Sequence, residues 1–309
     1  MSSKINIQLI NKNPANKGLR VIFANRYVAF KKNENTMKKT IFTLLFGLLF
    51  VIASGQTREQ LIEKAKTYYD AGDNLNAEKV TKQIIDLDSK YKSNYIYWSN
   101  LGTFQSNLGK QKEALKSYKK SIKLNDKFAL AFTNRAKLYS ELNETDKAIQ
   151  DYSKAIEIDP FNETALLDIG MIYVKKGDFV AARTYFEQLL SKYPDNYGAA
   201  SNLANIKKRQ GEHAEALTDF NDLILKNPDK AILYNNRADL YLKLKEYDKA
   251  IIDINKALEI DPDYLVAIIT KGEIYYEKGD FINACKYFKL GISKGFQKER
   301  IATYMEKCK

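Results

Sequence analysis

Four of the five prolines in the chain recur at one fixed interval, since Pro160, Pro194, Pro228 and Pro262 each follow the last by 34 residues. Proline lacks a backbone N–H and its ring clashes with the preceding turn, so a helix rarely continues through it. Prolines at a regular interval therefore mark the end of one helical unit after another. This interval predicts a chain that repeats a single helical hairpin, because each copy must end in the same way.

The residues between the prolines repeat with the same period. Seven units align on it: 58–91, 95–128, 129–162, 163–196, 197–230, 231–264 and 265–298. Position 8 of a unit is always glycine or alanine, namely Ala65, Gly102, Ala136, Gly170, Ala204, Ala238 and Gly272. Position 20 is always alanine, namely Ala77, Ala114, Ala148, Ala182, Ala216, Ala250 and Ala284. Small residues at both positions predict two helices that cross with their backbones close together, because a larger side chain would overpack the crossing.

A turn separates the two predicted helices of every unit. Glycine readily adopts the left-handed conformation that closes a helix C-terminus, and asparagine tolerates it. Position 15, in this turn, is Gly72, Gly109, Asn143, Gly177, Gly211, Lys245 and Gly279 in the successive units, so only the lysine departs from the rule. Three of the prolines are followed by an aspartate, and we expect these aspartates to cap the next helix. They are Asp195, Asp229 and Asp263.

This pattern resembles that of the tetratricopeptide repeat. Units 129–162 and 231–264 match nearly every diagnostic position of that repeat, whereas Thr81, Ser89 and Phe296 depart from it in the first and last units. The resemblance implies an all-α, right-handed superhelical solenoid of about seven hairpins, whose first helices line a concave groove. Residues 299–309 have a helical pattern and predict a C-terminal capping helix.

The N-terminal part of the chain lies outside the repeats. Residues 37–55 begin with Met37 and two lysines, continue with an uncharged apolar run and end in small residues, which is the pattern of a secretory signal peptide. A membrane anchor is the alternative, but the apolar run is shorter than the roughly 20 residues that a span needs. We therefore expect an exported protein, periplasmic or extracellular, that is cleaved near Gly55 and Gln56.

Residues 1–36 precede this segment and show neither helical nor strand periodicity. We interpret them as a mis-called or disordered leader in front of a true start at Met37, and a long basic leader is the alternative. The formal net charge is +12, and most of it comes from residues 1–40, where Glu34 is the single acidic residue. The rest of the chain is only weakly basic, so its charge does not indicate nucleic-acid binding.

The sequence offers no constellation typical of catalysis. Its one histidine, His213, falls in a repeat turn, and one histidine with two cysteines cannot assemble a metal site. No glycine-rich phosphate loop precedes a helix, because Gly109 belongs to a repeat turn. We therefore predict no enzymatic activity, no metal and no cofactor. A processing or carbohydrate enzyme is only a third hypothesis, behind two binding functions.

The two cysteines, Cys285 and Cys308, would meet an oxidising environment after export. Cys285 lies early in the second helix of the last unit and Cys308 near the end of the expected cap. A disulfide between them is geometrically possible and would fasten the cap to that unit. The alternative is that they are two separate small apolar residues.

Position 6 of the first helix carries a polar side chain in five successive units: Asn100, Asn134, Asp168, Asn202 and Asn236. An amide offers both a donor and an acceptor, and similar ladders in tetratricopeptide superhelices hold the main chain of an extended peptide. The alternative is that these side chains satisfy neighbouring helix backbones. Further groove candidates are Lys137, Asn205, Lys208 and Arg209, of which the last two belong to a basic cluster that is either a solvated helix end or a site for an acidic ligand.

Two binding functions follow. The first is a non-enzymatic interaction module that binds an extended peptide or a partner protein in its concave groove. The second is a structural scaffold or assembly factor of a cell-envelope complex, docked through its outer face. We expect neither nucleic acid nor a stable membrane span in either case.

Overall fold

The computed structural model describes residues 57–87 and 93–308, so the predicted leader and signal peptide lie outside the described residues. The chain divides into two compact units, Met1–Lys64 and Ala65–Lys309. The first unit contributes only the beginning of the first described helix. All further packing described below belongs to the second unit.

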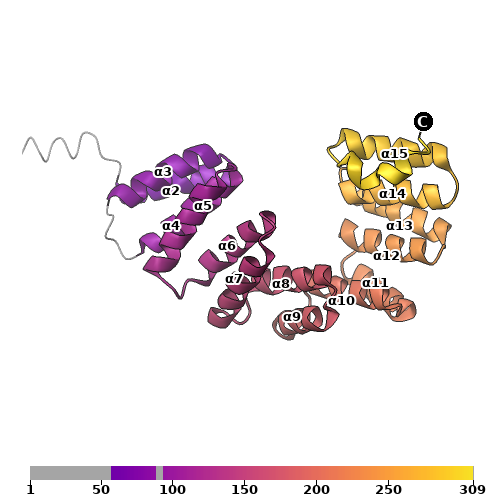
Figure 1. Cartoon of the computed structure of the whole chain (residues 1–309), viewed down its shortest axis with the longest axis horizontal. Coiled ribbons are helices and arrows are strands. Elements are labelled where there is room, and N and C mark those ends of the chain that lie inside the picture. Colours follow the sequence, from indigo (N-terminus) through magenta and orange to yellow (C-terminus); the bar gives the residue numbers. More distant parts are fainter. Residues whose placement is uncertain (1–56, 88–92, 309) are drawn as a thin grey trace, which may run out of the picture. The chain divides into compact units, whose positions relative to one another are not determined.

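The described residues form helices joined by short turns, and no strand occurs among them (Figure 1). The expected all-α repeat fold is therefore confirmed. Fourteen helices of 13 or 14 residues follow one another at the predicted repeat interval. They are α2 (Arg58–Asp70), α3 (Asn74–Leu87), α4 (Asn94–Asn107), α5 (Gln111–Leu124), α6 (Ala129–Glu141), α7 (Thr145–Ile158), α8 (Glu163–Lys176), α9 (Phe179–Lys192), α10 (Tyr197–Gln210), α11 (His213–Lys226), α12 (Ala231–Lys243), α13 (Tyr247–Ile260), α14 (Leu265–Glu277) and α15 (Phe281–Ser293).

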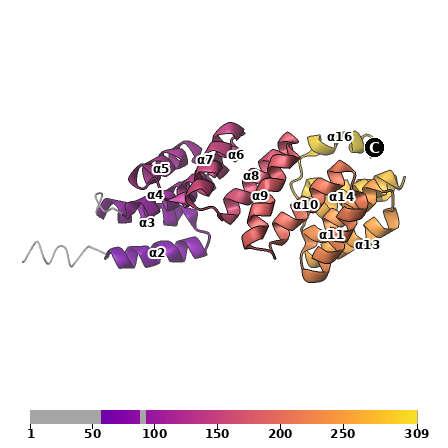
Figure 2. The ribbon, with the colours of Figure 1, turned by 90° about the horizontal axis from the view of Figure 1, so that it is seen from below.

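Helices α4 to α15 pair into six hairpins, each of which packs against the next. Within a hairpin the first helix lies against the second, as α8 and α9 do in both Figure 1 and Figure 2. Each second helix then contacts the following first helix, and successive first helices also contact one another. Two surfaces result, which we name the first-helix surface (α4, α6, α8, α10, α12, α14) and the second-helix surface (α3, α5, α7, α9, α11, α13, α15).

The small residues at position 8 make room for an aromatic ring of the same hairpin. A Cβ atom added to Gly170 would lie 2.6 Å from Cε1 of Phe186, and Gly102 and Gly272 face Tyr118 and Phe288 in the same way. These rings are almost completely buried, as are all the alanines at position 20. The prediction of closely approaching helices is confirmed, and the ring at position 24 is what the glycine admits.

The turn between the helices of each hairpin adopts a left-handed conformation at position 15. This holds for the five glycines and also for Asn143 and Lys245, with φ of 60° and 62°. The prediction made from glycine is therefore confirmed, and the one lysine adopts the same conformation at a steric cost.

The predicted caps at Asp195, Asp229 and Asp263 are wrong by one residue. The N-cap positions are Asn196, Lys230 and Tyr264, and the Asn196 side chain accepts a hydrogen bond from the Ala199 N–H at 2.9 Å. The residues around each proline form a turn of their own, which delays the helix start.

The C-terminal segment packs on the last hairpin, but it does not form one continuous capping helix. A 3₁₀ turn (Lys298–Ile301) leads into the short helix α16 (Ala302–Met305), which stops after one turn (Figure 2). Ile301 is buried with Ile269 and Phe288 of the last hairpin. A disulfide joins Cys308 to Cys285, with Cα atoms 5.3 Å apart, so the chain must turn back toward α15 instead of extending the helix.

Candidate functional site

The five polar residues of the predicted ladder all lie on the first-helix surface, and each is partly exposed. Asn100, Asn134, Asp168, Asn202 and Asn236 belong to α4, α6, α8, α10 and α12 in turn. The repeat period therefore places one such side chain on each of five successive first helices.

Three members of this ladder also bond to the preceding hairpin. The Nδ2 group of Asn134 donates to the Thr103 hydroxyl at 3.3 Å, and that of Asn236 donates to the Ser201 hydroxyl at 2.9 Å. The carboxylate of Asp168 accepts from the Tyr152 hydroxyl at 2.8 Å. Burial, followed by the Asp168 charge, raises the pKa of Tyr152, so this hydroxyl stays protonated and keeps donating.

These bonds use only part of the hydrogen-bonding capacity of the two asparagines. Each uses its amide N–H toward a neighbouring first helix, while its carbonyl oxygen has no partner among the described residues. A carbonyl oxygen of this kind accepts a hydrogen bond from a peptide N–H. The sequence left open whether these side chains satisfy neighbouring helix backbones or hold a main chain. Asn134 and Asn236 donate to side-chain hydroxyls of the neighbouring helix and not to its backbone, and their carbonyl oxygens stay available.

The predicted basic cluster has less unpaired positive charge than its sequence indicates. Lys208 is buried, and its Nζ lies 2.5 Å from a carboxylate oxygen of Asp239. The Nζ atom of the neighbouring Lys207 lies 2.6 Å from a carboxylate oxygen of Asp219. Arg209 is exposed, and no ion pair joins it to a described residue, so it is the one unpaired cation of the cluster. Asn205 is partly exposed. Lys137 is exposed further along the array.

An acidic region on α12 and α14 was not predicted. Glu273 forms no hydrogen bond or ion pair with any described residue. Burial, and then the charges of Asp239 and Glu277, raise its pKa to about 7. The repeat pattern could have revealed this acidic region. Asp239 and Glu273 both occupy position 9 of their units, and Lys137 occupies the same position in unit 129–162.

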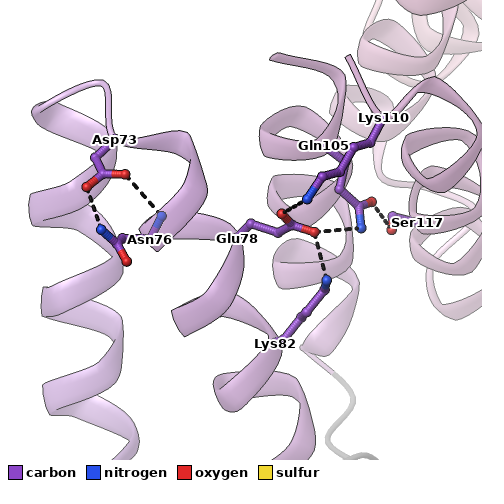
Figure 3. A network of polar contacts seen from close by, with 7 residues as sticks. All are labelled: Asp73, Asn76, Glu78, Lys82, Gln105, Lys110 and Ser117. Atoms are coloured by element: carbon purple, nitrogen blue, oxygen red, sulfur yellow. Dashed lines mark hydrogen bonds and ion pairs between the residues drawn. The ribbon is translucent and has the colours of Figure 1, made fainter. Parts of the chain in front are cut away.

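A second polar network crosses between α3 and α4, and it too was missed. The buried carboxylate of Glu78 accepts from Lys110 at 2.6 Å and from Lys82 at 2.7 Å, which reach it from opposite sides in Figure 3. Gln105 bridges Glu78 to Ser117 (Figure 3). Burial tends to raise the pKa of Glu78, but the two lysine hydrogen bonds outweigh it and lower that pKa below its ordinary value.

Two hairpins contain a nearly buried ion pair between their own helices. Arg135 contacts both carboxylate oxygens of Asp151, at 2.6 and 2.8 Å, and Arg237 contacts both of Asp253 at 2.7 Å. A bidentate pair of this kind fixes geometry, and its guanidinium is already satisfied. A cavity of about 410 Å³ lies over the Arg135–Asp151 pair. We assign these pairs to packing within the hairpin.

The described residues hold no cluster of histidine, cysteine, aspartate or glutamate that could bind a metal ion. Among the same residues, no helix is both long enough and apolar enough to cross a membrane. The arrangement thus consists of two extended surfaces that carry hydrogen-bonding and charged groups.

Comparisons with known proteins agree with this architecture. Three family models, each described as a tetratricopeptide repeat, match residues 129–162 and 231–264, residues 173–236, and residues 95–128. A crystal structure of a tetratricopeptide repeat protein from Parabacteroides merdae is 32% identical, with a TM-score of 0.72, over 82% of this chain and 99% of that one.

More distant structures share the fold alone. The Cut9–Hcn1 hetero-tetramer of the APC/C is 17% identical, with a TM-score of 0.58, over 80% of this chain and 55% of that one. The type IV pilus biogenesis factor PilW is 18% identical, with a TM-score of 0.57, over 67% of this chain and 96% of that one. No curated protein matches the chain.

Proposed function

The chain belongs to the tetratricopeptide repeat family, and on that premise we propose that it binds an extended segment of a partner protein along its first-helix surface. Proteins built from this repeat are in general non-catalytic interaction modules. The finer statement, that the bound segment is extended and lies on the ladder, is supported by one observation above all. Asn134 and Asn236 each keep a carbonyl oxygen without a partner on a partly exposed surface.

The spacing of these side chains suits a main chain better than a compact ligand. One polar side chain stands on each of five successive first helices, so the contacts repeat along the array. Position 9 of the repeat can select among bound segments, because its side chain changes in charge along the same surface. The residues are Lys137, Met171, Asn205, Asp239 and Glu273 in turn. A bound segment with acidic residues near Lys137 and basic residues near Glu273 would therefore be favoured.

Export is part of the proposal. The signal-peptide pattern at residues 37–55 lies outside the described residues, and it stays a prediction. N-terminal sequencing of the mature protein should find Gln56 at or next to the new terminus, whereas an intact Met37 would refute cleavage.

Peptide selection tests the proposed surface. Peptides are selected from a random display library on the chain, and their affinity is then measured for Asn134→Ala/Asn202→Ala/Asn236→Ala. We expect a loss of at least about tenfold, because each lost hydrogen bond contributes on the order of 1 kcal/mol. Undiminished affinity would remove the ladder from the function.

Two controls separate binding from folding. Replacing the exposed second-helix residues Glu187, Asn255 and Lys289 by alanine changes the same number of side chains away from the ladder. The pair Thr103→Val and Ser201→Ala removes the bonds between hairpins and leaves the asparagines in place. Retained affinity in both controls, with unchanged helicity by circular dichroism, assigns the loss to the ladder itself.

The alternative of a scaffold docked through the second-helix surface has one specific observation in its favour. A cavity lies on that surface between α3, α4 and α5. It is compatible with binding on the first-helix surface, since the two sites share only α4, and Asn134, Asp168, Asn202 and Asn236 lie on other helices.

A further inference from the structure

A cavity of about 310 Å³ opens between α3, α4 and α5, on the second-helix surface. Its apolar part is formed by Ile85, Trp98 and Leu101. The charged residues that line it are Lys82 and Asp86 from α3 and Glu113 and Lys116 from α5, beside Ser117. Trp98 is the only tryptophan of the chain. The volume is at the lower limit of small-molecule sites, so the cavity suits one side chain better than a larger ligand.

The cavity exists because this hairpin lacks a pair of side chains that other hairpins have. Positions 11 and 23 hold stacked tyrosines in two hairpins, Tyr173 with Tyr185 and Tyr275 with Tyr287, each with ring centroids 5.7 Å apart. The hairpin α4/α5 has Gln105 and Ser117 at these positions, joined by a hydrogen bond of 2.6 Å (Figure 3). The smaller pair leaves open the space that two rings fill elsewhere.

The helix beside the cavity is strongly basic. Helix α5 contains five lysines and one acidic residue, Glu113, and all five lysines are exposed. None of the five forms an ion pair with a residue in the described part of the chain, although Lys120 lies 5.9 Å from the Trp98 ring centroid. They recur at the spacing of one helix face, on which Lys116 borders the cavity: Lys112, Lys116, Lys119, Lys120 and Lys123.

We propose that this cavity and the lysine face of α5 form a second docking site, which binds an acidic segment of a partner protein that inserts one apolar side chain beside Trp98. The lysines select the charge of the segment, and the cavity selects its apolar anchor. An anchor that fills a recess while polar groups surround it is the usual centre of a protein interface.

A protein segment fits these features better than an anionic membrane does. A membrane-binding face projects apolar side chains outward into the lipid. Here the apolar atoms line a recess, and a protruding side chain is needed to reach them. The site is also independent of the proposed first-helix surface, because its charges lie on a second helix.

Fluorescence of Trp98 gives a direct test, since no other tryptophan contributes to the signal. The probes are synthetic 12-residue peptides of aspartate, glutamate and serine with one central leucine, isoleucine, phenylalanine or methionine. The control peptide has alanine at the central position, and the full chain is titrated with each. We expect at least one anchored peptide to bind saturably with a shift in Trp98 emission, about tenfold more tightly than the alanine peptide.

Two variants connect binding to the cavity and to the lysines. Ser117→Tyr fills the cavity with the residue found at the same position in two other hairpins, and it should abolish the emission shift. Lys116→Glu/Lys119→Glu should weaken binding at least about tenfold. Its matched control, Lys286→Glu/Lys289→Glu, changes the same two repeat positions on α15 and should leave affinity unchanged.

Four kinds of result would overturn the proposal. The first is that no anchored peptide binds at concentrations up to the millimolar range. The second is equal affinity for the anchored and alanine peptides, or binding that Ser117→Tyr does not affect. The third is a Trp98 shift with phosphatidylserine vesicles and none with the peptides, which would assign the surface to membranes. Loss of binding in Asn236→Ala as well would show that only the first-helix surface is used.

Discussion

Replacing Glu273 by glutamine should stabilise the folded chain, and only above acidic pH. The Glu273 carboxyl is partly buried on α14 near Asp239 and Glu277 and forms no ion pair with a described residue. Its pKa in the folded chain is about 7, against an ordinary value of 4.5. The unfolded chain therefore releases this proton more readily, and folding stability falls as pH rises from about 4.5 to 7.

The magnitude follows from the two pKa values. Each pH unit between them corresponds to about 1.4 kcal/mol, so ionisation of Glu273 lowers stability by at most about 3 kcal/mol. Solvent at this partly exposed site screens the repulsion, and we expect about 1–2 kcal/mol above pH 7. Glutamine has no proton to lose, so the difference between Glu273→Gln and the native chain should shrink toward zero as pH approaches 4.5.

Urea unfolding followed by circular dichroism at pH 5 and pH 8 measures this difference. Hydrogen exchange of α14 adds a local readout, because a repeat array can open at one end before the rest unfolds. Glu215→Gln, an exposed substitution on α11, is the control and should change little at either pH. Equal stabilisation by Glu273→Gln at both pH values, or none at pH 8, would refute the reasoning.

Three further predictions concern the hairpins and the C-terminal segment. Gly170→Ala places a methyl group 2.6 Å from the buried Phe186 ring, so overpacking of roughly 1–3 kcal/mol should exceed the helix-propensity gain of about 1 kcal/mol. A lower urea midpoint is expected, and a higher one would contradict the packing described here. Lys245→Gly relieves a left-handed residue with φ of 62° and should raise the free energy of unfolding by up to about 1 kcal/mol, seen as a higher urea midpoint. A lower midpoint would show that the turn is not strained. Reducing the Cys285–Cys308 disulfide opens a loop of 23 residues and should destabilise the last hairpin by about 3 kcal/mol. We expect faster hydrogen exchange in residues 296–308, and unchanged exchange would contradict a fastening role.

Periodic features of the chain could be predicted from the sequence, because each position of the repeat has the same neighbours in every hairpin. The glycines and alanines at position 8 predicted close helix crossings, and the turn glycines predicted left-handed residues, both of which the structure confirms. Lys245 adopts the same conformation, since the turn geometry comes from the hairpin and not from the side chain.

Features that depend on a partner side chain from another helix were missed. Lys208 was predicted as part of a basic groove, but the ion pair with Asp239 requires two first helices to be side by side. The pocket near Trp98 depends on Gln105 and Ser117, which are unremarkable residues until their positions are compared with the stacked tyrosines of other hairpins. The helix starts after the prolines were misplaced for a similar reason, since the turn around each proline extends one residue beyond the aspartate.

The central claim is that a partner segment lies across successive first helices. Hydrogen–deuterium exchange of the chain, alone and with a library-selected peptide, tests it most directly. The account predicts slower exchange on binding in α6, α8, α10 and α12, around Asn134, Asp168, Asn202 and Asn236. Protection confined to the second helices α7, α9, α11 and α13 would contradict it.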